Sequence, residues 1–198
     1  MRYIFDRSRI TPVRVSPHTL DEPIALLDEC ATWLRGRGID EQWPISFSNP
    51  DPDDPRDRIE ELWRYAALGH LWVMRDHNER GGVLGMMVVS HLPDFDFAPF
   101  WPGAVQGHHY GEELWNAHYL YRMAVRRDVI GQGLGAMMVD FALWLSRNTG
   151  MKYLRLDCSK TNIALHAHYK RLGFEHITTA EVPGRKSGAL FQREVSPR

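Results

Sequence analysis

The chain has 198 residues, of which 43% are hydrophobic and 25% are charged, and its formal net charge is −1. This composition is that of an ordinary globular protein of one domain, and the balanced charge gives no electrostatic case for nucleic acid or an anionic membrane surface as a partner. The two cysteines, Cys30 and Cys158, have no metal-ligand spacing, so we expect neither a disulfide framework nor a zinc site. We expect a cytoplasmic protein without a signal peptide, and no apolar run approaches the ~20 residues that a membrane helix needs.

The N-terminal half alternates between predicted strands and predicted helices. Apolar residues recur there with the period of a strand or of a helix, and Gly, Pro and polar clusters separate the segments. The expected strands cover 10–15, 70–75 and 83–90, and the expected helices cover 20–37 and 57–67. A polar turn joins the last two strands, which therefore form a hairpin.

Two connections stand out by composition. Residues 48–57 are rich in Pro and Asp, and we interpret them as a solvated loop rather than a metal site. Residues 91–115 are rich in Pro, Gly and aromatic residues, and connections of this length in compact domains are usually functional or disordered. The aromatic side chains of this second connection could cap an acceptor pocket, cover the core or form a dimer contact: Phe95, Phe97, Phe100 and Trp101.

Alternating glycines lie between a predicted strand and a predicted helix. The strand covers 117–125, and the helix runs from Gly131, Gly133 and Gly135 to Gly150. A helix N-terminus exposes unpaired N–H groups and a partial positive charge. Glycine lets an anion approach the backbone without a Cβ atom in the way. The segment therefore predicts a phosphate or pyrophosphate site.

Several interpretations of these glycines remain open. They could form only a tight strand-to-helix turn. A dinucleotide fold fits Gly131-x-Gly133-x-x-Ala136, with Asp157 at the end of the next strand as a ribose-binding acid. However, only some sixty residues follow the turn, which is too few for a doubly wound sheet. A Walker A loop is excluded, because no Lys-Ser/Thr pair follows the glycines.

The stretch Ile130-Gly131-Gln132-Gly133-Leu134-Gly135 resembles motif A of the GNAT superfamily of acyl-CoA N-acyltransferases, Arg/Gln-x-x-Gly-x-Gly/Ala. Ile130 stands where that family prefers Arg or Gln, a departure that leaves the backbone cradle unaffected. A strand is expected at 152–157. The segment 162–174 then resembles motif B of the same family, with Asn162, Tyr169, Gly173 and Phe174 in register.

The resemblance implies where acetyl-CoA binds. The amides of 131–136 would hold the pyrophosphate, the end of the preceding strand and the motif B Asn would contact the pantetheine arm, and the motif B Tyr would lie near the sulfur. The implied cofactor-binding residues are Met123, Ala124, Val125, Gly131, Gln132, Gly133, Leu134, Gly135, Ala136, Asn162 and Tyr169.

Acyl transfer to an amine needs a polarised carbonyl, a neutral amine and a protonated leaving thiolate. A strand amide near Met123 is the candidate oxyanion donor, and Tyr169 is the candidate general acid. Tyr119 and Tyr121 share one strand face and, by resemblance, occupy the places of two catalytic histidines in a better-known relative. Their ordinary pKa near 10 makes them poor bases, so they are also candidates to hold water or shape the pocket. Glu112, Glu113, His118 and a water chain are the alternatives.

The resemblance implies one α/β (α+β) domain over 1–198: a mixed, mostly antiparallel sheet of six or seven strands flanked by helices. Two central strands, near 118–125 and 153–158, should splay. The expected activity is direct transfer of acetyl from acetyl-CoA, without a metal, to a primary amine of a small molecule by a monomer or homodimer. A non-catalytic acyl-CoA sensor and a dinucleotide-binding oxidoreductase are the alternatives. His108-His109 and His166-x-His168 lack the further ligands of a metal site.

Overall fold

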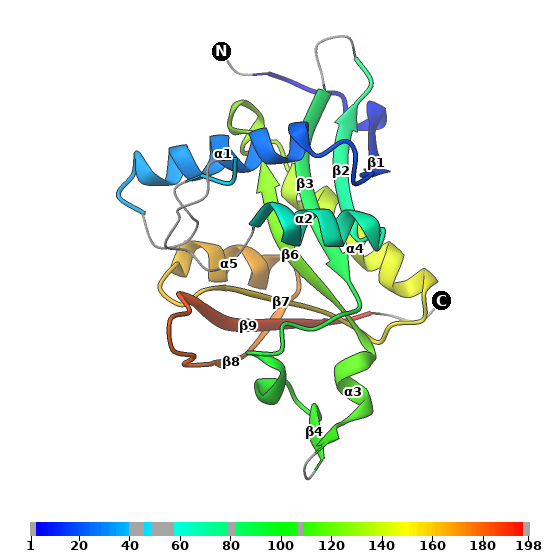
Figure 1. Cartoon of the computed structure of the whole chain (residues 1–198), viewed down its shortest axis with the longest axis vertical. Coiled ribbons are helices and arrows are strands. Elements are labelled where there is room, and N and C mark those ends of the chain that lie inside the picture. The colour runs from blue at the N-terminus through cyan, green and yellow to red at the C-terminus, as the bar shows by residue number, and fades with distance from the viewer. Residues whose placement is uncertain (1–2, 40–45, 49–57, 79–81, 107–108, 196–198) are drawn as a thin grey trace. The chain divides into compact units, whose positions relative to one another are not determined.

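A computed structural model of the chain describes residues 3–39, 46–48, 58–78, 82–106 and 109–195 (Figure 1). All of the predicted loop at 48–57 except Ser48 therefore lies outside the described residues. The chain divides into two compact units, Met1–Val88 with Arg122–Met138 and Val89–Tyr121 with Val139–Arg198. Each unit is described below by itself.

The first unit is built on an antiparallel group of strands. β1 (Ile10–Arg14) pairs with β2 (Leu71–Asp76), and β2 pairs with β3 (Gly82–Ser90), whose residues up to Val88 belong to this unit. The predicted hairpin is thus confirmed. The helices α1 (Asp21–Arg35) and α2 (Arg58–Ala67) lie across β2 and β3 on the viewer's side (Figure 1).

Each of these helices carries an apolar stripe that is buried. Leu27 of α1 and Leu62 of α2 are almost fully buried, as are Leu71 of β2 and Leu84 of β3. Burying a side chain of this size contributes roughly 1.5–3 kcal/mol relative to leaving it in water. The amphipathic pattern of the sequence is therefore the direct cause of this packing.

The segment of the predicted motif A forms the expected strand, turn and helix. β6 (Ala117–Val125) is followed by the short 3₁₀ helix η3 (Arg127–Val129) and then by α4 (Leu134–Asn148). The helix begins at Leu134, so Gly131 and Gly133 belong to the turn and Gly135 to the first turn of the helix. β6 and α4 each contribute residues to both units.

The second unit contains the C-terminal strands. β7 (Tyr153–Ser159) runs parallel to the start of β6, and β9 (Ser187–Glu194) is antiparallel to both β7 and β8 (Glu175–Thr179). The helix α5 (Ile163–Arg171) packs against β7 and β8. β8 was missing from the sequence prediction.

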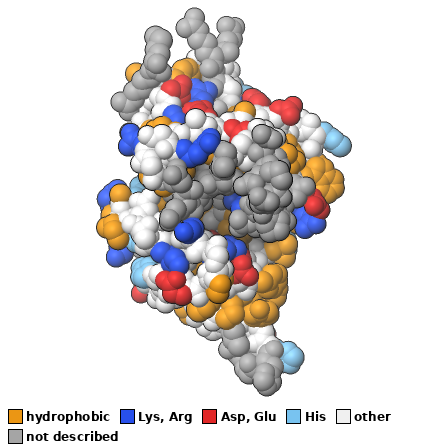
Figure 2. Space-filling model, turned by 60° about the vertical axis from the view of Figure 1, so that its left-hand side comes forward, with side chains coloured by type: hydrophobic (Ala, Val, Ile, Leu, Met, Phe, Trp, Pro, Cys, Tyr) orange, Lys and Arg blue, Asp and Glu red, His pale blue; other side chains and the backbone are white. Residues whose placement is uncertain are grey.

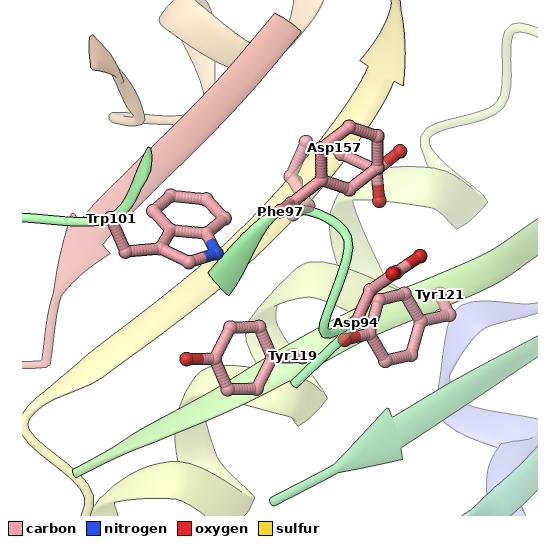
Figure 3. Close-up of a pocket in the computed structure, with 7 residues that line it drawn as sticks. Asp94, Phe97, Trp101, Tyr119, Tyr121 and Asp157 are labelled. Carbon is pink, nitrogen blue, oxygen red and sulfur yellow. The ribbon is translucent and has the colours of Figure 1, made fainter. Parts of the chain in front are cut away.

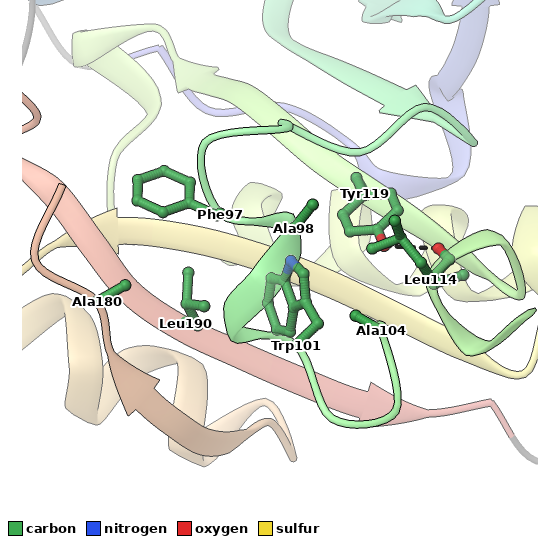
Figure 4. Close-up of a cluster of buried hydrophobic side chains, with 9 residues drawn as sticks. Phe97, Ala98, Trp101, Ala104, Leu114, Tyr119, Ala180 and Leu190 are labelled. Carbon is green, nitrogen blue, oxygen red and sulfur yellow. Dashed lines mark hydrogen bonds between the residues drawn. The ribbon is translucent and has the colours of Figure 1, made fainter. Parts of the chain in front are cut away.

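The connection 91–115 contains secondary structure of its own. It contains a 3₁₀ helix, a two-stranded sheet and one helical turn: η2 (Ala98–Phe100), β4 (Val105–Gln106), β5 (His109–Tyr110) and α3 (Glu112–Trp115). Phe97, Trp101 and Leu114 from this connection join Tyr119 and Leu190 in a buried cluster of the second unit (Figure 4). The connection is therefore part of the core.

The strand order of the sheet is β1-β2-β3-β6-β7-β9-β8. This is the predicted mixed, mostly antiparallel seven-stranded sheet. The register of β6 with β7 runs from Ala117↔Tyr153 to Tyr119↔Arg155, although both strands continue to Val125 and Ser159. The two predicted central strands therefore part after Tyr119.

On the face seen in Figure 2, the charged side chains of the described residues do not gather into a large field of one sign. Basic and acidic side chains are interspersed on the face seen in Figure 2, in keeping with the net charge of −1. None of the helices in the described part of the chain has both the length and the apolar character that crossing a membrane requires.

Candidate functional site

The glycine turn before α4 has the backbone that only glycine adopts easily. Gly131 has φ 78° and Gly133 has φ 85°, and L side chains are strained in this region. The turn is followed by the N-terminus of the 15-residue helix α4. The first N–H groups of this helix have no partner within it. This geometry fits the phosphate cradle that the sequence predicts.

Residues that the sequence gave no reason to suspect lie against this turn. Arg7, from the 3₁₀ helix η1 (Arg7–Arg9), donates from Nη2 to the carbonyl oxygen of Gln132 at 2.8 Å. The Gln132 side chain in turn donates from Nε2 to the carbonyl of Tyr3 at 2.6 Å. Two hydrogen bonds, one donated by Arg7 and one by Gln132, thus join the N-terminal segment to the turn.

The end of β6 is irregular where a cofactor arm is expected. Arg122 has φ 51°, the only positive φ of a non-glycine residue in the described chain, and it forms an ion pair with Glu61. Strained backbone of this kind clusters at functional sites. Further along, the Val125 carbonyl accepts from Arg127 Nε at 3.0 Å and from Cys30 Sγ at 3.5 Å. A pantetheine contact at Val125 would therefore use its N–H rather than its carbonyl.

The predicted motif B forms the expected helix. Asn162 is the N-cap of α5, and its side-chain oxygen accepts from the Leu165 N–H at 3.0 Å. The sequence did not predict this structural role for Asn162. It leaves the two N–H donors of the side-chain amide for another partner.

Tyr169, near the end of α5, is buried with 7% of its surface exposed. Its ring packs against Phe174 and Phe191, at centroid distances of 5.8 and 5.9 Å. Burial raises the pKa of Tyr169 far above the ordinary 10.0, and Cys158 and Asp157 nearby act in the same direction. The hydroxyl therefore keeps its proton throughout the neutral range.

A small pocket opens in the second unit (Figure 3). Its walls come from the segment 94–101, from β6 and from β7. The lining residues are four aromatic side chains, one leucine and two carboxylates: Phe97, Trp101, Tyr119, Tyr121, Leu156, Asp94 and Asp157. Asp157 lines the pocket and also raises the pKa of Tyr169. The pocket therefore lies close enough to the predicted general acid for their charges to interact.

The two strand tyrosines share a face, as predicted, and their rings stack at 6.2 Å with an angle of 8°. Tyr119 is 1% exposed, and its hydroxyl donates to the Leu114 carbonyl at 2.7 Å and accepts from Arg155 Nη1 at 3.2 Å (Figure 4). Burial raises the pKa of Tyr119, while the Arg155 charge lowers it in part. A raised pKa leaves even less of the tyrosine in its deprotonated, basic form at neutral pH. Tyr121 donates to the Leu92 carbonyl at 3.2 Å.

Arg155 is fully buried behind this wall. It donates to Gln192 Oε1 at 2.8 Å and to the Glu113 carbonyl at 3.0 Å, and its guanidinium lies 5.0 Å from the Trp101 ring centroid. Its Nη2 has no hydrogen-bond partner among the described residues. The guanidinium thus contacts Tyr119 and Trp101, two residues that line the pocket.

At the mouth of the pocket, Asp94 forms an ion pair with Arg185 Nη2, and Arg185 Nη1 donates to Asp96 at 2.8 Å. The Arg185 guanidinium also lies 4.7 Å from the Phe97 ring centroid. Despite burial, the carboxylates of Asp94, Asp157 and Asp96 raise the pKa of Arg185. Arg185 thus pairs with two carboxylates, and Asp157 acts on its pKa as a third.

The remaining candidates for the base, and Cys158, are placed by the structure as follows. The ring of His118 is buried, with Nδ1 3.0 Å from Ser146 Oγ, and Glu113 forms a 3.6 Å ion pair with Lys152. Glu112 is exposed. Burial raises the pKa of the Cys158 thiol to about 12, so it is not a ready nucleophile.

His166 Nε2 lies 2.8 Å from the Ser159 carbonyl, and no group of three His, Cys, Asp or Glu side chains in the described ranges could hold a metal ion. His108 lies outside those ranges. Of the aromatic residues of the connection, Phe97 and Trp101 are buried and line the pocket, whereas Phe95 and Phe100 are exposed.

Comparison with known proteins agrees with this geometry. A model of the acetyltransferase (GNAT) family matches residues 37–174. The chain is 33% identical over 177 residues to the uncharacterized N-acetyltransferase YesJ of Bacillus subtilis (strain 168), over 86% of this chain and 82% of that protein.

Solved structures share the fold. A GNAT-family acetyltransferase from Listeria monocytogenes 4b F2365, 24% identical, matches with a TM-score of 0.66 over 93% of this chain and 94% of that one. The structure of yncA from Salmonella typhimurium, which contains its cofactor acetyl-CoA, is 13% identical and matches with a TM-score of 0.59 over 96% of each chain.

Proposed function

The chain belongs to the GNAT family of acetyltransferases and is therefore an acyltransferase, and from this premise we propose that it transfers acetyl from acetyl-CoA directly to a primary amine of a small molecule. The family uses acetyl-CoA as co-substrate. We propose further that residues 1–198 act as one N-acetyltransferase domain. The observation that carries the proposal is the pocket of aromatic and carboxylate side chains beside Tyr169.

The residues of the glycine turn fit the cofactor. The turn suits a diphosphate, because Gly131 and Gly133 have positive φ and no Cβ atom. The first N–H groups of α4, which have no partner within the helix, can donate to the phosphate oxygens. We assign Gly131, Gln132, Gly133, Leu134, Gly135 and Ala136 to this contact. Met123, Ala124 and Val125 would contact the pantetheine arm through their backbone, and Asn162 through its side-chain amide.

Bound acetyl-CoA supplies an activated acetyl group. In the proposed step the C–N bond to the neutral amine forms and the C–S bond breaks. Tyr169 gives its proton to the sulfur, and its raised pKa keeps that proton available. The amine gives up one proton through water to solvent, and solvent returns a proton to Tyr169. The Met123 amide would stabilise the negative charge on the carbonyl oxygen.

The pocket supports an amine as the acceptor. Aromatic faces attract cations, and a carboxylate stabilises an ammonium group before it loses its proton. Asp157 lies in the pocket and close to Tyr169, so we propose that it binds the acceptor nitrogen. Tyr119 and Tyr121, the earlier candidates for the base, would instead form the wall on which the acceptor rests, because both hydroxyls already donate to carbonyl groups.

The test is release of CoA from acetyl-CoA in the presence of small primary amines, with and without a carboxylate on the amine. We expect turnover with amines that carry no negative charge. The Asp157→Asn variant should lower kcat/KM for the amine by roughly tenfold or more and leave KM for acetyl-CoA in place. Binding of acetyl-CoA without turnover across a broad panel would favour a sensor. Binding of nicotinamide or flavin cofactors but not CoA would favour an oxidoreductase.

A further inference from the structure

The N-terminal segment of the first unit is fastened onto the glycine turn. Tyr3 donates its N–H to the Asp128 carbonyl at 3.2 Å, Gln132 Nε2 donates to the Tyr3 carbonyl at 2.6 Å, and Arg7 Nη2 donates to the Gln132 carbonyl at 2.8 Å. The Arg126 guanidinium also lies 5.1 Å from the Tyr3 ring centroid. These contacts join residues more than 120 positions apart and fix where the Arg7 side chain lies.

The charged end of Arg7 lies in the space that glycine leaves open. A Cβ atom added at Gly133 would collide with Arg7 Nη2 and come within 3.3 Å of its Cζ. An anion that approaches a glycine backbone uses the space in which a side chain would otherwise stand. The guanidinium therefore occupies part of the space through which an anion would reach the Gly133 amide, so an anion bound there would contact Arg7 directly.

Other side chains at the turn are less suited to meet a phosphate. Arg126 forms an ion pair with Asp128 at 2.7 Å, and Arg127 bonds the Val125 carbonyl and lies over the Trp33 ring at 4.6 Å. Ile130, at the start of the turn, carries no charge. Arg7 is exposed and uses one of its five N–H donors in the bond to Gln132, so it retains donors for a phosphate oxygen.

We propose that Arg7 is a cofactor-binding residue, which contacts the diphosphate of acetyl-CoA at the turn 131–136. The inference rests on the proposed use of acetyl-CoA. A guanidinium recognises phosphate oxygens through short, charge-assisted hydrogen bonds, and its charge adds to the partial positive charge of the α4 N-terminus. The side chain thus adds a full positive charge to a cradle of backbone amides.

Calorimetric titration with CoA tests this without turnover. We compare the wild type with Arg7→Ala, with Arg7→Gln, which keeps a donor for the Gln132 carbonyl but loses the charge, and with Arg9→Ala as the matched control. We expect both Arg7 variants to raise Kd for CoA by roughly tenfold or more, since tenfold corresponds to ~1.4 kcal/mol and charged hydrogen bonds contribute at least about this much. Arg9→Ala should bind CoA as the wild type does.

The same titration with 3′-dephospho-CoA, which keeps the diphosphate, locates the contact. An equal loss of affinity for CoA and dephospho-CoA in the Arg7 variants supports the proposal. If the loss of affinity disappears with dephospho-CoA, Arg7 contacts the 3′-phosphate and the proposal is overturned. Unchanged binding of CoA by Arg7→Gln would also overturn the proposal. Tighter binding of CoA by Arg7→Gln would overturn it as well and would mean that Arg7 blocks the turn. If the wild type binds no CoA, the proposed function itself fails.

Discussion

At the scale of single residues, two buried tyrosines differ in what their hydroxyls do. Tyr119 donates to the Leu114 carbonyl and accepts from Arg155, so both roles of its hydroxyl are engaged within the core. Tyr169 lies among rings, and its pKa is raised chiefly by burial. The sequence could place both side chains on the correct elements. It could not distinguish them, because the partners of Tyr119 lie 5 and 36 positions away and depend on the folded chain.

The Tyr169→Phe variant tests the proposed general acid. We expect kcat to fall by roughly a hundredfold or more, because a positioned acid contributes about 10²–10⁴ to such a rate. A tyrosine with a raised pKa is active while protonated and loses activity only as pH rises through that pKa, so its alkaline limb should lie above pH 10.0. Steady-state rates against pH, with CD spectra of both proteins, measure this. An unchanged rate and pH profile would remove Tyr169 from the chemistry.

At the scale of elements, α5 combines a predictable motif with an unpredicted cap. The spacing of Asn162, Tyr169 and Gly173 is local, so the sequence alone predicted a helix and its position. β8 was missed because its polar residues, Glu175–Thr179, do not alternate clearly with apolar ones. Arg7 at the glycine turn and Asp94 in the pocket were missed for another reason. Each meets its neighbours across long sequence separations, which no local pattern reports.

Substitutions of Asn162 separate its cap from its proposed contact with the cofactor. Asn162→Ala removes the acceptor of the Leu165 N–H and should lower the free energy of unfolding by about 1 kcal/mol. Asn162→Ser keeps a capping oxygen but lacks the amide donors, so its stability should stay near that of the wild type. If the side-chain amide of Asn162 contacts acetyl-CoA, both variants should show a raised KM for acetyl-CoA. Denaturant unfolding and kinetics measure the two effects, and a wild-type KM in Asn162→Ser would leave the residue with capping alone.

At the scale of the whole molecule, the fold could be predicted further than the site. The resemblance carried by the two motifs implied a mixed sheet of six or seven strands, and the sheet has seven. The pocket draws Asp94, Phe97 and Trp101 from the connection between β3 and β6, where the sequence has no period. Such a segment is ordered by what it packs against, so its residues acquire a role only in the folded chain.

Thermal unfolding with acetyl-CoA tests the whole chain as one acetyltransferase domain. A ligand at a hundred times its Kd stabilises the native state by ~2.7 kcal/mol, and each kcal/mol raises Tm by roughly 2–4 °C for a protein of this size. We therefore expect Tm to rise by about 5–10 °C at saturating acetyl-CoA, in a single transition whose calorimetric and van't Hoff enthalpies agree. Arg7→Gln at the same acetyl-CoA concentration should show a smaller rise, because its Kd is higher. Two separate transitions, of which acetyl-CoA shifts only one, would contradict the single domain, since a ligand stabilises only the cooperative unit that contains its site.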